Sequence, residues 1–382
     1  MLSNDVSARV RELIARSNLS DADFASRVGL DGPKLSKSLS GDRRFTSVNL
    51  ARIAQFTNTT VDWILGRDDE SPALAARHDS GGVTSEEETQ VAIEKATEWA
   101  KVRADLKRLG YPQSECAFQS ESRGRSYITD GEKLAADAVS YLRSKNIDHT
   151  SDRNLIDIVE DWFGVDIAVV PAGSKFEGLT WRDGSCRLIV IGTSSVPGRR
   201  RFTLAHELAH LLAEDNQKLT LDKVGGERDS SEIRANTFAA CFLMPEKVIR
   251  EKLANESVDK DQFAALSCEM FVTPTTLAWR LFNLKLIDGQ KRRNLSQLTA
   301  MEAAVIAGQT AEFSSWIKNS LTPRLPRKLV EDAGRAYLDG RTTLRPFANL
   351  VGVDTKELRS ALEAERSELD MEMDNEKVTV LA

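Results

Sequence analysis

Two histidines one helical turn apart constrain this chain more than any other feature of its sequence. They lie in the segment GRRRFTLAHELAHLLAED, where apolar residues recur at the spacing of an amphipathic helix. His206 and His210 therefore share one face about 6 Å apart, close enough to bind one metal ion, and neutral imidazole is a favoured ligand of zinc. Glu207 lies beside them, placed to take a proton from a water that zinc acidifies to a pKa of roughly 7. The alternative is a core helix that happens to carry these three residues.

A second helical segment, SSEIRANTFAACFLMPEK, offers the third ligand that a catalytic zinc requires. Glu232 is the candidate, and it leaves the fourth coordination position open for water. Asn236 follows one turn later on the same face, where its side chain can hydrogen-bond the back of a histidine ligand. With both helices counted, the sequence favours a metal centre over an ordinary core helix.

These linked motifs resemble a known family. FTLAHELAH, then EIRANTFAA and then LMP are similar to the ImmA/IrrE zinc metallopeptidases, whose members cleave DNA-binding repressor proteins. The resemblance covers about residues 128–288. It implies that His206, His210 and Glu232 bind zinc in a gluzincin-like site, that Glu207 is the general base, and that the substrate is a repressor-type protein.

Residues 1–67 have the pattern of a compact five-helix unit. Ser20 and Asp31 are expected to cap its second and third helices. The spacing Ala25-x-x-x-Gly29 is what a tight helix-turn-helix requires, with a small residue where two helices touch and a glycine where the chain turns through positive φ. Leu35 is expected to anchor the third helix inward.

This N-terminal unit resembles the XRE family of phage-repressor-like DNA-binding domains. It carries 10 lysines and arginines against 7 acidic residues, although the whole chain has a net charge of -6, and this local excess suits a surface that faces the phosphates of double-stranded DNA. The alternative is a helical interaction module. Gly32 and Pro33 stand where the family often carries base-reading side chains, so contacts should come from five other residues: Lys34, Ser36, Lys37, Arg43 and Arg44.

Residues 68–127 are expected to form a linker with one long helix. The first part is polar and rich in proline, glycine and serine, and the helix runs from Ser85 to about Leu109. Ala92, Trp99 and Leu106 repeat every seven residues. This stripe is compatible with a coiled-coil homodimer seam and equally with packing on the next domain.

Residues 128–288 are expected to form a small α+β core in an otherwise mainly α-helical protein. DIAVVPAG, FEGLTWRDG and CRLIVIG are typical of three short strands, whose edge could hold a substrate segment in extended form. His149 is expected at the surface. Residues 289–382 are expected to form a separate helical domain.

No segment is typical of export or of a membrane span, and the four cysteines form no CxxC pair, so we expect free thiols in a cytoplasmic protein. Cys116 has one alternative role, as a thiolate that blocks the zinc before activation. The sequence thus predicts a DNA-binding zinc metallopeptidase of a stress, phage or mobile-element response. Two alternatives remain: a non-proteolytic transcription regulator that uses the metal site as a sensor, and the toxin of a toxin/antitoxin pair.

Overall fold

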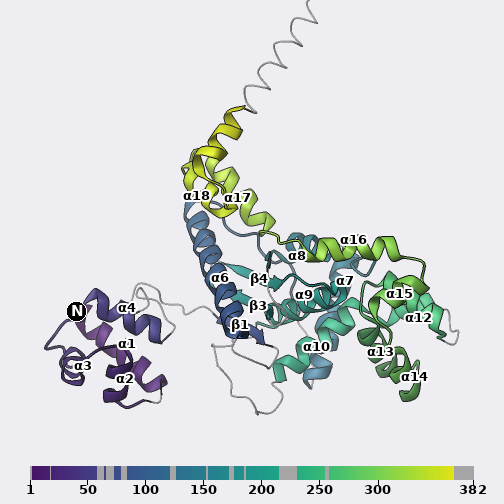
Figure 1. The fold of residues 1–382 in the computed structure, drawn as a ribbon, viewed down its shortest axis with the longest axis horizontal. Helices are drawn as coiled ribbons and strands as arrows, with labels where there is room; N and C mark the ends of the chain where they lie inside the picture. The colour runs from purple at the N-terminus through teal and green to yellow at the C-terminus, as the bar shows by residue number, and fades with distance from the viewer. Residues whose placement is uncertain are drawn as a thin grey trace, which may run out of the picture. The chain divides into compact units, whose positions relative to one another are not determined.

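The fold was analysed in a computed structural model, which describes residues 2–17, 19–57, 64–65, 73–78, 84–120, 126–151, 154–171, 176–184, 186–214, 230–253 and 258–364. The chain divides into two compact units, residues 1–72 and 73–382. Helices predominate in both units, and a small sheet lies in the second (Figure 1).

The first unit is helical and has a core of its own. Four of the five predicted helices are present: α1 (Leu2–Arg16), α2 (Asp21–Arg27), α3 (Gly32–Leu39) and α4 (Ser47–Phe56). Of the fifth, only residues 64–65 lie within the described part of the chain. The apolar side chains that hold the unit together include Val10, Phe24, Leu35, Ile53 and Ile64.

The turn between α2 and α3 has the geometry that its sequence predicts. Gly29 has a φ of +64°, and Ala25 is buried where the two helices meet. Ser20 caps α2 by accepting a hydrogen bond from the Asp23 backbone N–H at 3.2 Å. Asp31 occupies the N-cap position of α3, as predicted, but its side chain makes no capping hydrogen bond. Its carboxylate pairs with Lys34 instead, which lowers the pKa of Asp31.

The second unit is built on a four-stranded sheet. The three predicted strands are present as β2 (Asp166–Val170), β3 (Phe176–Arg182) and β4 (Arg187–Gly192). The strand order is β1-β3-β4-β2, with β3 antiparallel to β4 and β2 parallel to it. The fourth strand, β1 (Ala73–His78), pairs antiparallel with β3 in a stretch that we expected to be linker. The edge of β3 explains this difference, because its unpaired backbone groups can recruit a neighbouring extended segment.

Helices cover both faces of the sheet, and alternate residues of its strands separate two cores. Ile167 and Val169 face a core shared with α7 (Tyr127–Ser144), α8 (Leu155–Phe163), α9 (Pro197–Leu212) and α10 (Ser230–Leu243). Ala168 and Val170 face the opposite core, shared with α6 (Thr84–Leu109), α17 (Arg327–Leu338) and α18 (Leu344–Val351). Figure 1 shows α17 and α18 beside one end of α6.

The heptad stripe of α6 packs within the chain. Ala92, Trp99 and Leu106 are buried against the sheet and α17, so the stripe matches the packing alternative rather than a dimer seam. The helices beyond residue 288, which we expected to form a separate domain, belong to the second unit. No described helix is both long and apolar enough to cross a membrane.

The remaining helices extend the second unit beyond α10. They are α11 (Glu246–Leu253), α12 (Lys260–Glu269), α13 (Pro274–Asn283), α14 (Gly289–Leu295), α15 (Ala300–Ile306) and α16 (Thr310–Leu321). Among them, α16 contacts α9 and α15 contacts α12. Elements from the last third of the chain therefore lie against the helix that carries the two histidines.

Contacts of two arginines connect the C-terminal region to the sheet. Arg103 of α6 is fully buried, and its guanidinium bonds Asp166 of β2 at 2.6 and 2.8 Å and Asp332 of α17 at 2.6 Å. Arg324 exchanges two backbone hydrogen bonds with Val169, at 2.8 and 2.9 Å, and its side chain donates to the Ile167 carbonyl. The segment before α17 thus covers part of the outer edge of β2.

Candidate metal centre

The candidate metal centre is built on α9. The sequence of this helix determines where it begins and which of its faces is buried. Pro197 stands at the first helical turn, where its missing N–H costs no hydrogen bond. Leu204, Ala205 and Leu208 pack into the core on one side. With that side of the helix in the core, His206 and His210 lie on the side that contacts α10, and both imidazoles are buried.

The three predicted ligand residues converge on one point. The Nε2 atoms of His206 and His210 lie 3.0 Å apart. In the Glu232 carboxylate, from the first turn of α10, Oε2 lies 3.3 Å from Nε2 of His206 and Oε1 lies 3.3 Å from Nε2 of His210. Asn236 follows one turn later, and its Oδ1 lies 3.2 Å from His206 Nδ1. When this oxygen accepts a hydrogen bond from Nδ1–H, the Nε2 lone pair of His206 is directed at the common point.

This donor set fits a tetrahedral divalent metal. Zinc binds imidazole nitrogen and carboxylate oxygen at about 2.0–2.2 Å, so two ligand atoms of a tetrahedral site lie roughly 3.3 Å apart. The two imidazole nitrogens lie 3.0 Å apart and each has a Glu232 oxygen at 3.3 Å, so the separations are close to that value. Two nitrogens and one carboxylate oxygen also match the donors that zinc prefers, and they leave one coordination position for water or substrate.

Glu207 lies beside the three converging residues and is fully buried under β3. Its Oε2 accepts a hydrogen bond from the Thr180 hydroxyl at 2.8 Å. Its Oε1 has no hydrogen-bond partner among the described residues. Burial raises the pKa of the Glu207 carboxyl, while the nearby imidazoles of His206 and His210 oppose that change. Thr180 therefore holds Oε2 of Glu207 in place, and Oε1 is available to accept a proton.

Glu232 has the opposite electrostatic environment. Burial alone would raise the pKa of its carboxyl, but hydrogen bonds to His206 and His210 hold it well below its usual range. A carboxyl that stays ionised at neutral pH is suited to bind a cation. The two glutamates of the centre thus differ in the way that a ligand and a base must differ.

Two residues that contact Glu207 were not identified from the sequence. Gly178 of β3 faces the Glu207 side chain so closely that a Cβ at this position would lie 3.0 Å from both Cγ and Oε1. Thr180, two residues along the strand, points to the same side and supplies the hydroxyl. The alternation of FEGLTWR does put both residues on one face of the strand, but it does not reveal that α9 lies beneath that face.

The five predicted DNA contacts lie in the first unit, apart from the metal centre. Lys34, Ser36 and Lys37 project from α3 and are exposed, and Arg44 is exposed in the loop that follows. Arg43 is half-buried, and its backbone N–H caps α3 by donating to the Lys37 carbonyl. Lys34 is engaged with Asp31, so a phosphate would have to compete with that carboxylate.

The structure corrects the expectation for His149 and argues against the alternative role of Cys116. His149 is buried rather than at the surface: its ring stacks on Phe242, and Nε2 lies 2.7 Å from the Phe242 carbonyl oxygen. Cys116 packs against the apolar core, where burial raises the pKa of its thiol. A thiol with a raised pKa is a poor metal ligand, which argues against the thiolate alternative. All four cysteines are free, as expected.

Known proteins resemble the region around this centre. Residues 166–281 match a family model described as the IrrE N-terminal-like domain, a peptidase family. A stretch of 99 residues is 40% identical to the radiation response metalloprotease IrrE of Deinococcus radiodurans. The matched stretch is 24% of this chain and 28% of that relative, so the similarity is to one part of each protein. The range matched by the family model, 166–281, contains the β-strands β2 to β4 and the helices α9 and α10.

Proposed function

We propose that this chain is a zinc-dependent endopeptidase whose general base is Glu207. The observation that carries the proposal is the convergence of His206, His210 and Glu232 beside a buried carboxylate with one available oxygen. The similarity of residues 166–281 to a peptidase domain supports it. Zinc at this point would acidify water and polarise the carbonyl of the bond to be cleaved.

The residues around the zinc position have separate tasks. His206, His210 and Glu232 would hold the ion, and Asn236 would fix the tautomer of His206. Thr180 holds Oε2 of Glu207, so Oε1 is the atom that takes the proton of the attacking water. The same carboxyl then returns that proton to the amine that leaves, which completes general-base and general-acid catalysis with one residue.

We further propose that the substrate is a repressor-type regulatory protein and that cleavage belongs to a stress, phage or mobile-element response. The similarity to a protein named for its radiation response supports a stress setting. The exposed basic residues of α3 and the following loop support a second activity, the binding of double-stranded DNA by residues 1–67. Such a protein acts where the DNA is, in the cytoplasm of a bacterium.

The decisive experiment compares the wild type with Glu207→Gln. Glutamine has nearly the same size and keeps the Thr180 contact, and it is not one of the three proposed ligands, so each chain should retain about one zinc ion by elemental analysis. The amide cannot act as a base. Cleavage of repressor-type proteins should therefore slow by at least roughly a hundredfold, the usual contribution of such a group.

Two results would count against this function. Protein purified without added metal that holds less than a tenth of an equivalent of zinc, and takes up none when zinc is supplied, would exclude the metallopeptidase. Retained zinc with unaltered regulation in cells and no cleaved protein would instead favour the sensor alternative. Chelation of the metal is the matched control, because it should abolish cleavage by the wild type and be reversed by zinc.

A further inference from the structure

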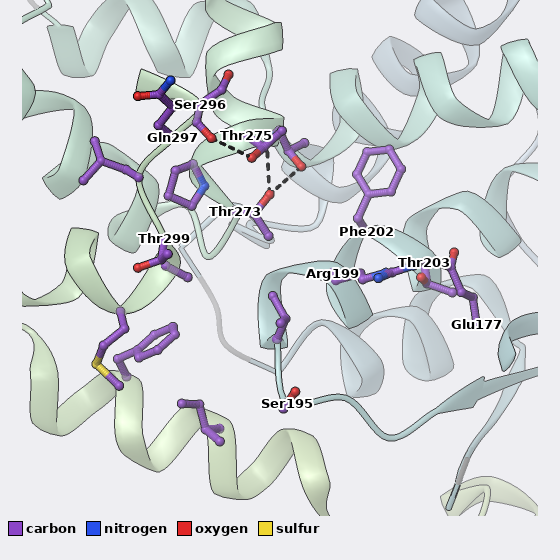
Figure 2. Close-up of a pocket in the computed structure, with 18 residues that line it drawn as sticks. Glu177, Ser195, Arg199, Phe202, Thr203, Thr273, Thr275, Ser296, Gln297 and Thr299 are labelled. Carbon is purple, nitrogen blue, oxygen red and sulfur yellow. Dashed lines mark hydrogen bonds and ion pairs between the residues drawn. The ribbon is translucent and has the colours of Figure 1, made fainter. Parts of the chain in front are cut away.

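A cavity of about 820 Å³ lies next to the metal centre in the second unit. Its walls come from five places: Glu177 of β3, the first half of α9 with the two residues before it, the start of α13 with Thr273, the segment 296–301 and α16. Figure 2 shows Thr273, Thr275 and Ser296 on one side and Arg199, Thr203 and Glu177 on another, with Phe202 between them. This volume lies within the usual range for binding sites of small ligands, roughly 300–1,000 Å³.

The cavity begins one helical turn from the proposed ligands and base. Phe202 and Thr203 line it, and they precede His206 and Glu207 by four residues on α9. Four residues of an α-helix correspond to about 6 Å along its axis. The Thr203 methyl group also borders the space above Gly178, 3.0 Å from the position of a Cβ there, as the Glu207 carboxylate does. The space in front of Glu207 and the cavity therefore share a wall.

This spacing matches the geometry of a bound peptide. Each residue of an extended chain advances about 3.3–3.6 Å. A peptide whose cleaved bond lies at Glu207 therefore brings a residue one or two positions away to the mouth of the cavity. The side chain of that residue is the part of a substrate that can enter.

The residues that line the cavity disfavour a charged substrate side chain. Among these 18 residues only Glu177 and Arg199 are ionised, and these two pair with each other. The apolar part is formed by Leu298 and Met301 together with Phe313 and Ile317 of α16. The Thr273 and Thr276 hydroxyls bond each other at 2.8 Å, and the Thr275 hydroxyl donates to the Ser296 carbonyl, so these three hydroxyls are already engaged.

We propose that this cavity is the specificity pocket of the enzyme and takes a large, uncharged apolar side chain next to the cleaved bond. The inference rests on the proposed peptidase function and deepens it by naming a substrate class. Eight of the 18 lining residues, 296–301 with Phe313 and Ile317, lie beyond the part of the chain that matches the peptidase family. The C-terminal helices would thus determine which bond is cut.

The test is a cleavage profile of a randomised synthetic peptide library, read by mass spectrometry, for the zinc-loaded full-length protein and two variants. Met301→Lys puts a cation at the pocket. Val305→Lys is the matched control, because Val305 is an exposed apolar residue one turn further along α15 that does not line the cavity. Zinc content and thermal unfolding of all three proteins report on folding.

The wild type should prefer Leu, Met or Phe at one position flanking the cleaved bond. Met301→Lys should reduce kcat/KM for these peptides by about tenfold to a hundredfold, the usual effect of a mismatched pocket. It should also raise cleavage of peptides with Asp or Glu at that position, a gain that a misfolded protein cannot show. Val305→Lys should keep the wild-type profile. If Met301→Lys does not fold, Gln297→Lys, at an exposed lining residue, replaces it.

The possible failures are distinguishable. A wild type that cleaves no peptide while it holds zinc contradicts the proposed function itself. A wild type that cleaves peptides with no apolar preference, or whose profile is the same in Met301→Lys, Gln297→Lys and Val305→Lys, leaves the peptidase intact and overturns the pocket.

Discussion

At the scale of single residues, the predicted metal ligands and their neighbours differ in how far sequence could reveal them. His206 and His210 could be proposed as ligands because the 3.6-residue period of a helix puts residues four apart on one face. Glu232 was proposed from a second helical segment, and its position beside them depends on how the two helices pack. Gly178 and Thr180 act through contacts between a strand and a helix about 30 residues apart in the chain, and no local period encodes such contacts. His149 was predicted at the surface for the same reason. Its neighbours in the sequence are polar, and its contact with Phe242 is made with a helix far along the chain.

The burial of His149 has a consequence for stability against acid. Burial, followed by the charge of Arg201, lowers the pKa of His149 to about 4 from its ordinary value of 6.5, although the Phe242 carbonyl and Asp148 oppose this change and Arg143 adds to it. Because protonation is harder in the folded state, its contribution to stability is complete above pH 6.5 and is lost as the pH falls toward 4. A difference of about 2.5 between the two pKa values corresponds to about 3 kcal/mol.

Urea unfolding of the wild type and His149→Gln at pH 7, 6 and 5 measures this contribution. The wild type should be the more stable protein at pH 7, and the difference between the two free energies of unfolding should shrink as the pH falls. Other titrating groups, including those of the metal centre, are common to both proteins and largely cancel in that difference. A difference that stays constant from pH 7 to pH 5 would contradict the assignment.

At the scale of elements, helices and strands with strong periodicity were predicted well. The strands β2, β3 and β4 fall within the predicted segments, and α9 and α10 bring the candidate ligands together on facing sides. β1 was not predicted because the stretch ALAARH has no Val, Ile, Thr, Phe, Tyr or Trp, the residues that favour strands. It is extended because it pairs with β3, and that pairing cannot be read from the segment itself. The packing partner of the apolar stripe of α6 could not be predicted either. The same seven-residue apolar repeat allows a helix to pack on a partner helix or on a sheet.

The buried contact of Arg103 with β2 and α17 should be a large contribution to stability. Arg103→Met leaves Asp166 buried without its guanidinium, which should cost about 3–5 kcal/mol in the free energy of unfolding. Adding Asp166→Leu removes the stranded charge and should recover most of this loss.

Arg182→Met, at a partly exposed pair with Glu214, is the comparison for these urea-unfolding measurements and should cost no more than about 1 kcal/mol. Equal losses in Arg103→Met and Arg182→Met would mean that the buried contact adds nothing specific.

At the scale of the whole molecule, the two units should behave independently. The first has its own apolar core, and the candidate DNA contacts and the candidate metal ligands lie in different units. We expect Lys37→Ala to weaken binding to a specific DNA site and to reduce the dependence of that binding on salt, because one phosphate or base contact is lost. His206→Ala should leave DNA binding nearly unchanged.

Fluorescence anisotropy with labelled DNA at several salt concentrations measures both effects. Full-length protein and a version without residues 1–72 complete the comparison, since the shortened protein should bind zinc but not the DNA site. DNA binding that survives the removal of these residues would show that the first unit is not the DNA-binding part.

The contacts of Arg103 and Arg324 also set the order of events during synthesis. The ribosome has made all three candidate ligands once residue 232 is added, but Arg324 and Asp332, which cover β2 and neutralise Arg103, come about 100 residues later. At a translation rate of roughly 5–20 residues per second, that interval is about 5–20 s. A nascent chain would therefore carry its candidate metal ligands for several seconds before the segment that covers the outer edge of β2, and the Asp332 partner of Arg103, have been made.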